Sequence, residues 1–414
     1  MGTSLGRLAT ALAAAAWATL GPSPASADEA AAALAAKKEL EARIAEEDPG
    51  WRWEALNLQT SFLYQEGRGL QSQAGPIGGR GREDAWVLQP WAQFRVRQND
   101  QVVHELTVPV DIVSAASTDA VDAVSKASEY NEAVTLDLTS TYSPSEVVDM
   151  SFRFGFHYEE PMRSFIGGPS LTFKLFEENT VIGLNMIVMS DGFDPHNWEG
   201  KDRGFTARTS FGFNASLVQV LSETTLLDAS FGTTQQWGTL ETTWNSMVVH
   251  REPTEEDPRT VVRDGERFPR SRNRDAFFVR LSQHVPGSGT TGKVGYRFYL
   301  DENATFAHTL EAQLFQYIVP WLYVRAHGRL HTQTSPDFWV PFIEEGFVES
   351  TKRTSDSDLE AFTSREAGLR VVLLRERAPL AIRGKDSFNL EYLRYQRDNG
   401  LHADFGSLGY QKTF

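Results

Sequence analysis

The 414-residue chain contains no cysteine, which excludes disulfide bonds, cysteine-ligated metal sites, cysteine nucleophiles and thiol-linked lipid anchors. Long hydrophobic runs are also missing from its body. Beyond the N-terminus the longest, Ile182 to Met189, is far shorter than the roughly 20 residues of a spanning helix. The chain has 40 Lys and Arg residues against 55 Asp and Glu residues. The resulting formal net charge of −15 argues against nucleic acid and anionic surfaces as partners. Ten Trp and 26 Phe nevertheless predict a large folded body rather than a disordered chain.

The N-terminus has the layout of a secretory signal peptide. Arg7 precedes the weakly apolar segment 8–20, and Ala25-Ser26-Ala27 forms a cleavage site of the A-x-A type. Residues 1–27 are therefore predicted to be removed. The Ala-, Glu- and Lys-rich segment that follows favours a helix, which Asp48-Pro49-Gly50 would stop. We expect residues 28–50 to form a periplasmic helical arm or linker.

From Trp51 onward the hydrophobic period changes from that of a helix to two residues. Between residues 150 and 158, for example, apolar side chains alternate with Ser151, Arg153, Gly155 and His157. Successive side chains of a strand point to opposite faces, so each such segment has one apolar and one polar face. The segments are about as long as a tilted strand that crosses a bilayer. The pattern predicts strands that begin near residues 53, 84, 102, 132, 147, 169, 180, 204, 223, 272, 291, 306, 320, 365, 386 and 403.

The connections between these segments alternate in length. Short turns are expected at 98–101, 143–146, 177–179, 220–222, 286–290 and 317–319, and long polar loops at 66–83, 114–131, 190–203, 237–271 and 335–364. The gaps at 302–305 and 376–385 break this rule. Short periplasmic turns and long external loops are typical of outer-membrane barrels. Residues 51–414 are therefore predicted to form one antiparallel transmembrane β-barrel of about sixteen strands, in the bacterial outer membrane, with both termini periplasmic.

Aromatic residues gather at the ends of strands that this topology places at the periplasm. An interfacial girdle belongs there. Its expected members are Trp51, Trp53, Tyr317, Trp321, Tyr410 and Phe414. We expect Phe414 and Tyr410 to serve also as the signal that barrel-assembly machinery recognises.

Several short motifs resemble an uncharacterised family of Gram-negative outer-membrane proteins. They are Val110-Asp111 with Ser114-Ala115-Ala116-Ser117, Phe268-Pro269-Arg270-Ser271-Arg272-Asn273-Arg274, and Tyr296-Arg297-Phe298-Tyr299 with Asp301. The resemblance implies an outer-membrane barrel. It implies no activity, catalytic residue or cofactor. Glu302-Asn303-Ala304 stands where acidic or aromatic residues often continue the last motif.

Many charged residues fall on the face opposite the apolar one. Each Arg or Lys facing the middle of a bilayer costs roughly 2–4 kcal/mol, so these charges should face a lumen. The candidate lumen or mouth charges are Arg153, Arg208, Arg270, Arg272, Arg274, Arg280, Arg297, Arg325, Arg329, Asp111, Asp301 and Glu311. They could set the selectivity of a pore, or they could pair with one another and brace the wall.

Two long loops could constrict or plug a lumen of this size. The first, 237–271, leads directly into Arg270, Arg272 and Arg274, whose spacing places them on one face of a strand. These three are the strongest candidates for contact with a solute anion or a lipopolysaccharide phosphate.

No metal, cofactor or catalytic residue is predicted. His327 and His331 share a face, but four strand residues separate them by about 13 Å, which is too far for one ion. No Gly-x-Ser-x-Gly motif occurs, and nothing points to a nucleophile with its base. The pattern favours a porin-like passive channel for small, anionic solutes. The alternatives are a closed structural or surface-binding barrel acting through its external loops, and an outer-membrane hydrolase.

Overall fold

The computed structural model describes residues 50–66, 85–115, 131–159, 162–194, 201–241, 246–250, 252, 261–344, 351–356, 358–379 and 384–414. The chain divides into two units, 1–50 and 51–414, of which the second is described below. The predicted signal peptide and nearly all of the predicted arm lie outside the described residues. No helix in the described part is long and apolar enough to cross a membrane.

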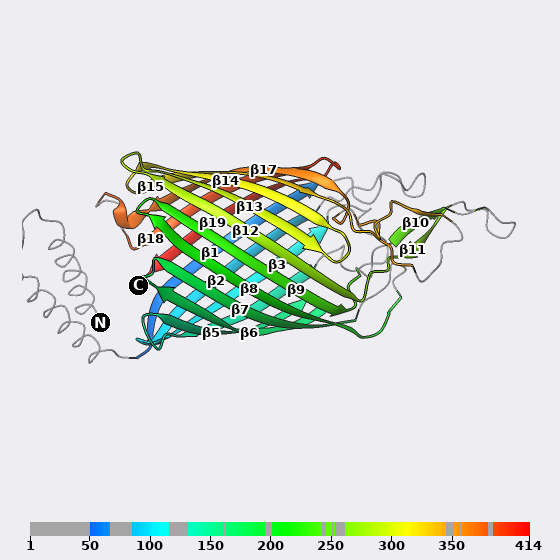
Figure 1. Ribbon diagram of the computed structural model, residues 1–414, viewed down its shortest axis with the longest axis horizontal. Helices are drawn as coiled ribbons and strands as arrows, with labels where there is room; N and C mark the ends of the chain where they lie inside the picture. Colours follow the sequence, from blue (N-terminus) through cyan, green and yellow to red (C-terminus); the bar gives the residue numbers. More distant parts are fainter. Residues whose placement is uncertain are drawn as a thin grey trace, which may run out of the picture. The chain divides into compact units, whose positions relative to one another are not determined.

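Sixteen antiparallel strands close into a barrel, which confirms the predicted β-barrel (Figure 1). Each strand is hydrogen-bonded to its predecessor and its successor among the barrel strands. The first eight are β1 (Arg52–Glu66), β2 (Ala85–Asn99), β3 (Val102–Ala115), β4 (Asn131–Tyr142), β5 (Val148–Glu159), β6 (Met162–Leu175), β7 (Thr180–Phe193) and β8 (Thr206–Ser222). The others are β9 (Thr225–Gly238), β12 (Ser271–Val285), β13 (Thr290–Asp301), β14 (Phe306–Val319), β15 (Leu322–Gln333), β17 (Phe362–Leu374), β18 (Asp386–Arg397) and β19 (His402–Thr413).

The barrel closes where β1 pairs with β19. The register sets Leu58 opposite Tyr410 and continues to Ala55 opposite Thr413. The backbone N–H of Phe414 then donates to the carbonyl oxygen of Glu54 at 3.0 Å. This seam leaves no open edge in the barrel wall.

The outer face of the wall is apolar and exposed. On β5, Met150, Phe152 and Phe154 are 47%, 56% and 54% exposed. Gly155, which lies on the inner face of the same strand, is buried. Aromatic and aliphatic residues continue this face around the barrel, with Leu136 opposite Phe156 and Leu310 opposite Tyr296. In water such a surface would be strongly unfavourable. The inside-out pattern is that of a barrel whose outer face meets lipid.

The two ends of the barrel differ in their connections. We call one end the short-turn rim. The start of β1 and the end of β19 lie there, beside turns at 100–101, 143–147, 176–179, 223–224, 286–289 and 320–321. At the opposite end, the long-loop rim, connections include 67–84, 116–130, 194–205, 239–270 and 334–361. The two exceptions seen in the sequence are real. The turn 302–305 is short, and 375–385 is long enough to contain the 3-10 helix η2 (Arg375–Arg377).

Two long loops build a small sheet of their own beyond the long-loop rim (Figure 1). The strands are β10 (Ser246–His250), β11 (Val261–Gly265) and β16 (Ile343–Glu344), with β10 in the centre. We call this sheet and residues 264–270 and 336–356, where described, the loop module. Met247 and Ile343 are buried in it, and Phe268 packs on Phe338 with ring centroids 5.3 Å apart. The sequence predicted these loops as long, but not that they pair with each other.

One predicted strand boundary is clearly wrong. The strand expected near residue 169 begins at Met162, and the loop expected at 190–203 begins only after β7 ends at Phe193. The misplaced start coincides with Gly167-Gly168-Pro169, a sequence typical of a turn. Within the barrel, these residues instead lie in β6, and the β6–β7 register skips the position of Pro169, which has no N–H to donate.

Candidate functional site

Alternation along the strands places nearly all of the predicted charges on the inner face of the barrel. Inward positions alternate along each strand with the exposed apolar residues of the outer face. They pair with inward positions of the neighbouring strand, as Arg280 does with Asp228 and Glu311 with Arg329. The predicted candidates that share this face are Arg153, Arg208, Arg272, Arg274, Arg280, Arg297, Arg325, Arg329, Asp111, Asp301 and Glu311. Arg270 does not join them, because β12 begins at Ser271 and Arg270 is exposed at the long-loop rim.

The inward charges are sorted around the barrel by sign. On β12 to β17 the inward basic residues outnumber the inward carboxylates Asp301, Glu311 and Glu366. The inward basic residues are Arg272, Arg274, Arg280, Lys293, Arg297, Arg325, Arg329 and Arg370. We call this the basic wall.

The opposite side of the lumen has the reverse excess. On β3 to β5 a single inward Arg, Arg153, faces the carboxylates of what we call the acidic wall: Glu105, Asp111, Asp137, Asp149 and Glu159. In the circular order of sixteen strands, β3, β4 and β5 stand eight places from β13, β14 and β15. The two walls therefore face each other across the lumen, which creates a field perpendicular to the barrel axis.

Ion pairs hold many of the arginines in the basic wall. Arg280 Nε lies 3.0 Å from Asp228, and Arg272 lies 2.5 Å from Asp301. Glu391 of β18 bonds to both Arg325 and Arg370. The Arg280–Asp228, Arg272–Asp301 and Arg370–Glu391 pairs join neighbouring strands, and the Arg325–Glu391 pair reaches from β15 across β17 to β18, so these charges also help to fix the register of the wall.

Two cations of the basic wall are held by aromatic rings rather than by carboxylates. Lys293 Nζ lies 5.1 Å from the ring centroid of Phe315, and the guanidinium of Arg297 lies 5.6 Å from that of Phe278. Among the described residues neither has an ion-pair partner. A ring face orients a cation without cancelling its charge. Lys293 and Arg297 are therefore two cations of this wall whose charge is not neutralised by an ion pair among the described residues.

The acidic wall is only partly neutralised. Asp137 is bonded to Arg153, and Asp149 lies 2.8 Å from Lys174 of β6. Glu105 accepts a hydrogen bond from the Gln93 amide at 3.0 Å, which leaves its charge intact. Within the described part of the chain Asp111 has no basic partner either. Negative charge thus persists opposite Lys293 and Arg297.

Asp301 joins the basic wall to the long-loop rim. Its side chain is fully buried and bonds to Arg272, while its Oδ1 accepts the backbone N–H groups of Asn303 and Thr305 at 2.9 and 3.0 Å. Ala304 completes the turn in the left-handed region, with φ of 63°. The short connection at 302–305 is therefore a turn built around one carboxylate.

The two inward histidines are not brought together as a pair of ligands. His327 Nδ1 lies 3.1 Å from Glu366, and His331 Nδ1 lies 2.8 Å from the Thr309 hydroxyl. In the described ranges no group of three or more His, Asp or Glu residues could hold a metal ion.

Some wall carboxylates were not recognised in the sequence. Asp191 was assigned to a loop, yet it lies in β7 with a fully buried side chain, 2.6 Å from Arg208. Glu54 binds Arg95 and Arg97 beside the bulge at the start of β1, and Glu366 binds Arg329 at 3.8 Å. Charge complementarity to an inward arginine was the available signal.

The predicted aromatic residues lie at the short-turn rim. Trp51, Trp53 and Phe414 are 62%, 56% and 46% exposed, and Tyr410 packs on Phe388 with centroids 5.1 Å apart. Tyr317 belongs to the same rim, beside the 320–321 turn that contains Trp321. Lys412 Nζ lies 4.8 Å from the centroid of the Phe414 ring.

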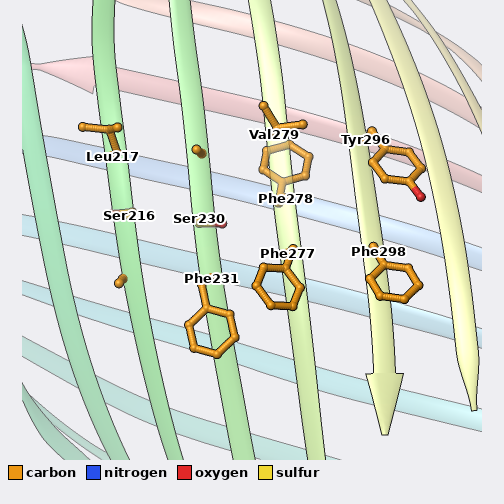
Figure 2. Close-up of a pocket in the computed structure, with 11 residues that line it drawn as sticks. Ser216, Leu217, Ser230, Phe231, Phe277, Phe278, Val279, Tyr296 and Phe298 are labelled. Atoms are coloured by element: carbon orange, nitrogen blue, oxygen red, sulfur yellow. The ribbon is translucent and has the colours of Figure 1, made fainter. Parts of the chain in front are cut away.

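An apolar groove of about 420 Å³ lies on the outer surface of the wall and extends over β8, β9, β12 and β13. Figure 2 shows Phe231, Phe277 and Phe298 side by side on neighbouring strands, with Leu217, Val279 and Tyr296 in the next row. Ala215 and Ala229 supply the space between them. The groove belongs to the lipid-facing surface, where an acyl chain of the bilayer would fill it.

Comparison with known proteins gives one family match. A family described as "Protein of unknown function (DUF3570)" matches residues 163–412, which run from β6 to β19 and include the whole basic wall. Of the motifs that suggested a resemblance, those at 268–274 and 296–301 lie within this range, and Val110-Asp111 lies before it. No curated protein matches the chain.

Solved structures with a similar arrangement are outer-membrane proteins of low identity. A bacterial polysaccharide outer membrane secretin gives a TM-score of 0.44 at 7% identity, covering 87% of this chain and 98% of that one. OccK1 (OpdK) of Pseudomonas aeruginosa gives 0.43 at 8%, covering 87% and 98%. A BenF-like porin from Pseudomonas fluorescens Pf-5 gives 0.44 at 8%, covering 87% and 99%.

Proposed function

We propose, from the premise that this chain belongs to the DUF3570 family of proteins of unknown function, that it is a porin-like passive channel for small anionic solutes. The observation that carries the proposal is the basic wall set against the acidic wall across one lumen. A sixteen-stranded wall is wide enough to enclose an aqueous channel.

The field between the walls supports selection by charge. An anion that enters is drawn toward Lys293 and Arg297, whose charges no described carboxylate cancels. The low dielectric constant of the protein wall strengthens this attraction relative to bulk water. The aromatic rings beside both cations orient them without cancelling their charge.

The difference between the two rims supports a proposed orientation and proposed partners. We place the short-turn rim and both termini of the chain at the periplasm, and the long-loop rim with its loop module outside. The outer face then contacts lipid, and the long-loop rim is level with lipopolysaccharide. The aromatic residues around Phe414 and Tyr410 are the proposed recognition site for the assembly machinery.

Planar bilayers provide the test. Purified, folded protein is expected to give stepwise conductance, and its reversal potential in a salt gradient should show anion preference. Changing Lys293 and Arg297 together to Gln should lower the anion-to-cation permeability ratio, and Glu105→Gln with Asp111→Asn should raise it. Arg365→Gln is the control, since Arg365 is exposed on the outer face. A folded protein without ion-selective steps would overturn the channel.

The loop module supports a second candidate, a barrel that acts by binding through its external loops. The module has its own buried residues and a charged contact of 2.5 Å between Arg353 and Asp264. Removing residues 246–265 should abolish binding to cells or surfaces if this is the main role, and should only change conductance in a channel.

A further inference from the structure

A second cavity, of about 600 Å³, lies where the long-loop rim meets the loop module. It is built from the end of β9, the segment that leads into β12, the 302–305 turn and the loop module. Its lining includes Trp237, Arg270, Glu302, Asn303, Asp337 and Lys352. This volume is within the range of pockets that hold small ligands, roughly 300–1,000 Å³.

Backbone hydrogen bonds fix the walls of this cavity. The carbonyl oxygen of Arg270 accepts from Gly238 N–H at 2.9 Å, next to Trp237. Glu302 N–H donates to Asn273 at 3.1 Å, and Asp337 N–H donates to Asn303 at 2.9 Å. Lys352 precedes Arg353, which pairs with Arg267 through two backbone hydrogen bonds. The lining is therefore pre-formed by the barrel and the module together.

Gly238 is required for this arrangement. Its φ of 115° lies in the region that favours glycine, and a Cβ there would overlap the carbonyl oxygen of Ala207. The chain can therefore turn away from β9 directly after Trp237 and bring its N–H to Arg270.

The side chains offer three kinds of contact. Arg270 and Lys352 are exposed cations, and neither has an ion-pair partner in the part of the chain that is described. Glu302 and Asp337 are exposed carboxylates that can accept hydrogen bonds from hydroxyl groups. The Trp237 side chain, 46% exposed, provides a flat apolar surface with one N–H donor.

We propose that this cavity binds a saccharide bearing a phosphate group. The apolar face of the sugar ring would pack on Trp237, its hydroxyls would donate to Glu302 and Asp337, and Arg270 and Lys352 would hold the phosphate. Carboxylates beside the cations disfavour a simple inorganic anion, since they repel it, while they suit a ligand that carries both hydroxyls and charge.

The ligand chemistry has two sources. One is the phosphorylated glucosamine headgroup of lipopolysaccharide at this rim, and the other is a free sugar phosphate in solution. Arg272 and Arg274 play no part in either case, because Arg272 is bonded to Asp301 and Arg274 to Gln236 inside the wall. The proposal does not depend on conduction through the lumen.

Binding of glucose 6-phosphate to the full-length protein in detergent, followed by ligand-observed NMR, tests the site. We expect glucose 6-phosphate to bind more tightly than glucose or inorganic phosphate. Arg270→Gln with Lys352→Gln should weaken it at least about ten-fold, as expected when a charge-assisted hydrogen bond is lost. Trp237→Ala should weaken glucose 6-phosphate and glucose alike. Arg365→Gln should change nothing.

A second arm distinguishes the sources. The protein is reconstituted in phosphatidylcholine vesicles with and without lipopolysaccharide, and glucose 6-phosphate binding is measured again. Competition by lipopolysaccharide identifies the headgroup, and unchanged binding identifies a soluble sugar phosphate. Heat-modifiable migration in gels verifies that each variant is folded, and Arg270→Lys should retain most binding. If glucose 6-phosphate and lipopolysaccharide both fail to bind, or if the double variant binds as well as wild type, the proposal is wrong.

Discussion

Asp301 is a buried carboxylate with four bonded partners: one arginine, two backbone amides and the Tyr299 hydroxyl, which donates at 3.4 Å. Its position links the inner wall of β13 to the turn that closes β13 against β14. A buried charge of this kind is tolerated only while its partners are in place.

Asp301→Ala should lower the free energy of unfolding by about 3–5 kcal/mol, because Arg272 would remain buried without a counter-charge. Urea titration of the protein folded into lipid vesicles measures this loss. Asp100→Ala is the matched control, since the Asp100–Arg52 pair of 3.4 Å is exposed and should contribute at most about 1 kcal/mol. Equal losses in the two variants would contradict the role given to Asp301.

For single residues, the sequence predicted which side of the barrel wall a charged side chain lies on better than it predicted the partner of that side chain. The period of two correctly separated Arg153 and Arg280 from the lipid face. It could not show that Arg272 and Arg274 are bonded within the wall, while Arg270, two residues before, is exposed. That difference depends on where β12 begins, which the pairing with β9 decides.

The close approach of two neighbouring strands requires glycine at some positions. A Cβ at Gly168 of β6 would overlap the carbonyl oxygen of Met186 in β7. Gly328 of β15, by contrast, has open space where a Cβ would be.

Gly168→Ala should therefore destabilise the barrel by about 1–3 kcal/mol or more, the usual cost of overpacking, whereas Gly328→Ala should have little effect. Urea midpoints of the two variants, measured side by side in the same lipid, decide between them. A Gly168→Ala barrel as stable as Gly328→Ala would show that the two strands can separate freely.

Burial raises the pKa of the Asp356 carboxyl in the loop module, although the Asp358 N–H acts in the opposite direction. The folded module keeps this proton to a higher pH than the unfolded loop does. Its contribution to stability is therefore full below the ordinary pKa of 3.8 and is lost as the pH rises through the folded value.

Asp356→Asn should accordingly protect the module at neutral pH, because it removes the buried charge and keeps the acceptor for Asp358 N–H. Hydrogen exchange of residues 353–356 measures that protection. The advantage over wild type should vanish in acid, where Asp356 is protonated. Equal exchange in both proteins at neutral pH would contradict the shift.

Most elements were predictable because hairpins are local. Fifteen of the sixteen barrel strand starts followed from period and turn chemistry, and the start of β6 was displaced by several residues, because Gly167-Gly168-Pro169 has a sequence typical of a turn. The loop module was not predictable. The β10–β16 contact joins Val249 to Ile343, and no local pattern marks a pairing across so long a stretch of chain.

The whole molecule is a closed wall, and its seam places Phe414 beside the first strand. Phe414→Asp should reduce the amount of folded barrel in the membrane before it alters any conductance, because it puts a charge on the girdle at the seam. Heat-modifiable protein in membrane fractions measures this. Phe176→Asp is the control, with a 76% exposed ring in a turn at the same rim. Normal levels of the Phe414 variant would count against the assembly role.

The opposition of the basic and acidic walls appears only at this scale. The sequence predicted inward charges of both signs, which left both a selective pore and a braced wall open. Closing the barrel in register places β14 eight strands from β4, so the signs separate across the lumen although most of them also pair locally. The structure shows both kinds of charge: Asp228 and Arg280 pair with each other and brace the wall, whereas Lys293 and Arg297 have no ion-pair partner among the described residues.

The β1–β19 seam also has a consequence in time. Every other neighbouring pair consists of consecutive barrel strands, whereas β1 must wait for a strand made more than three hundred residues later. Until β19 is synthesised, the hydrogen-bonding edge of β1 has no native partner and can pair with the wrong chain. The barrel strand that is synthesised first is thus the last to gain both of its neighbours.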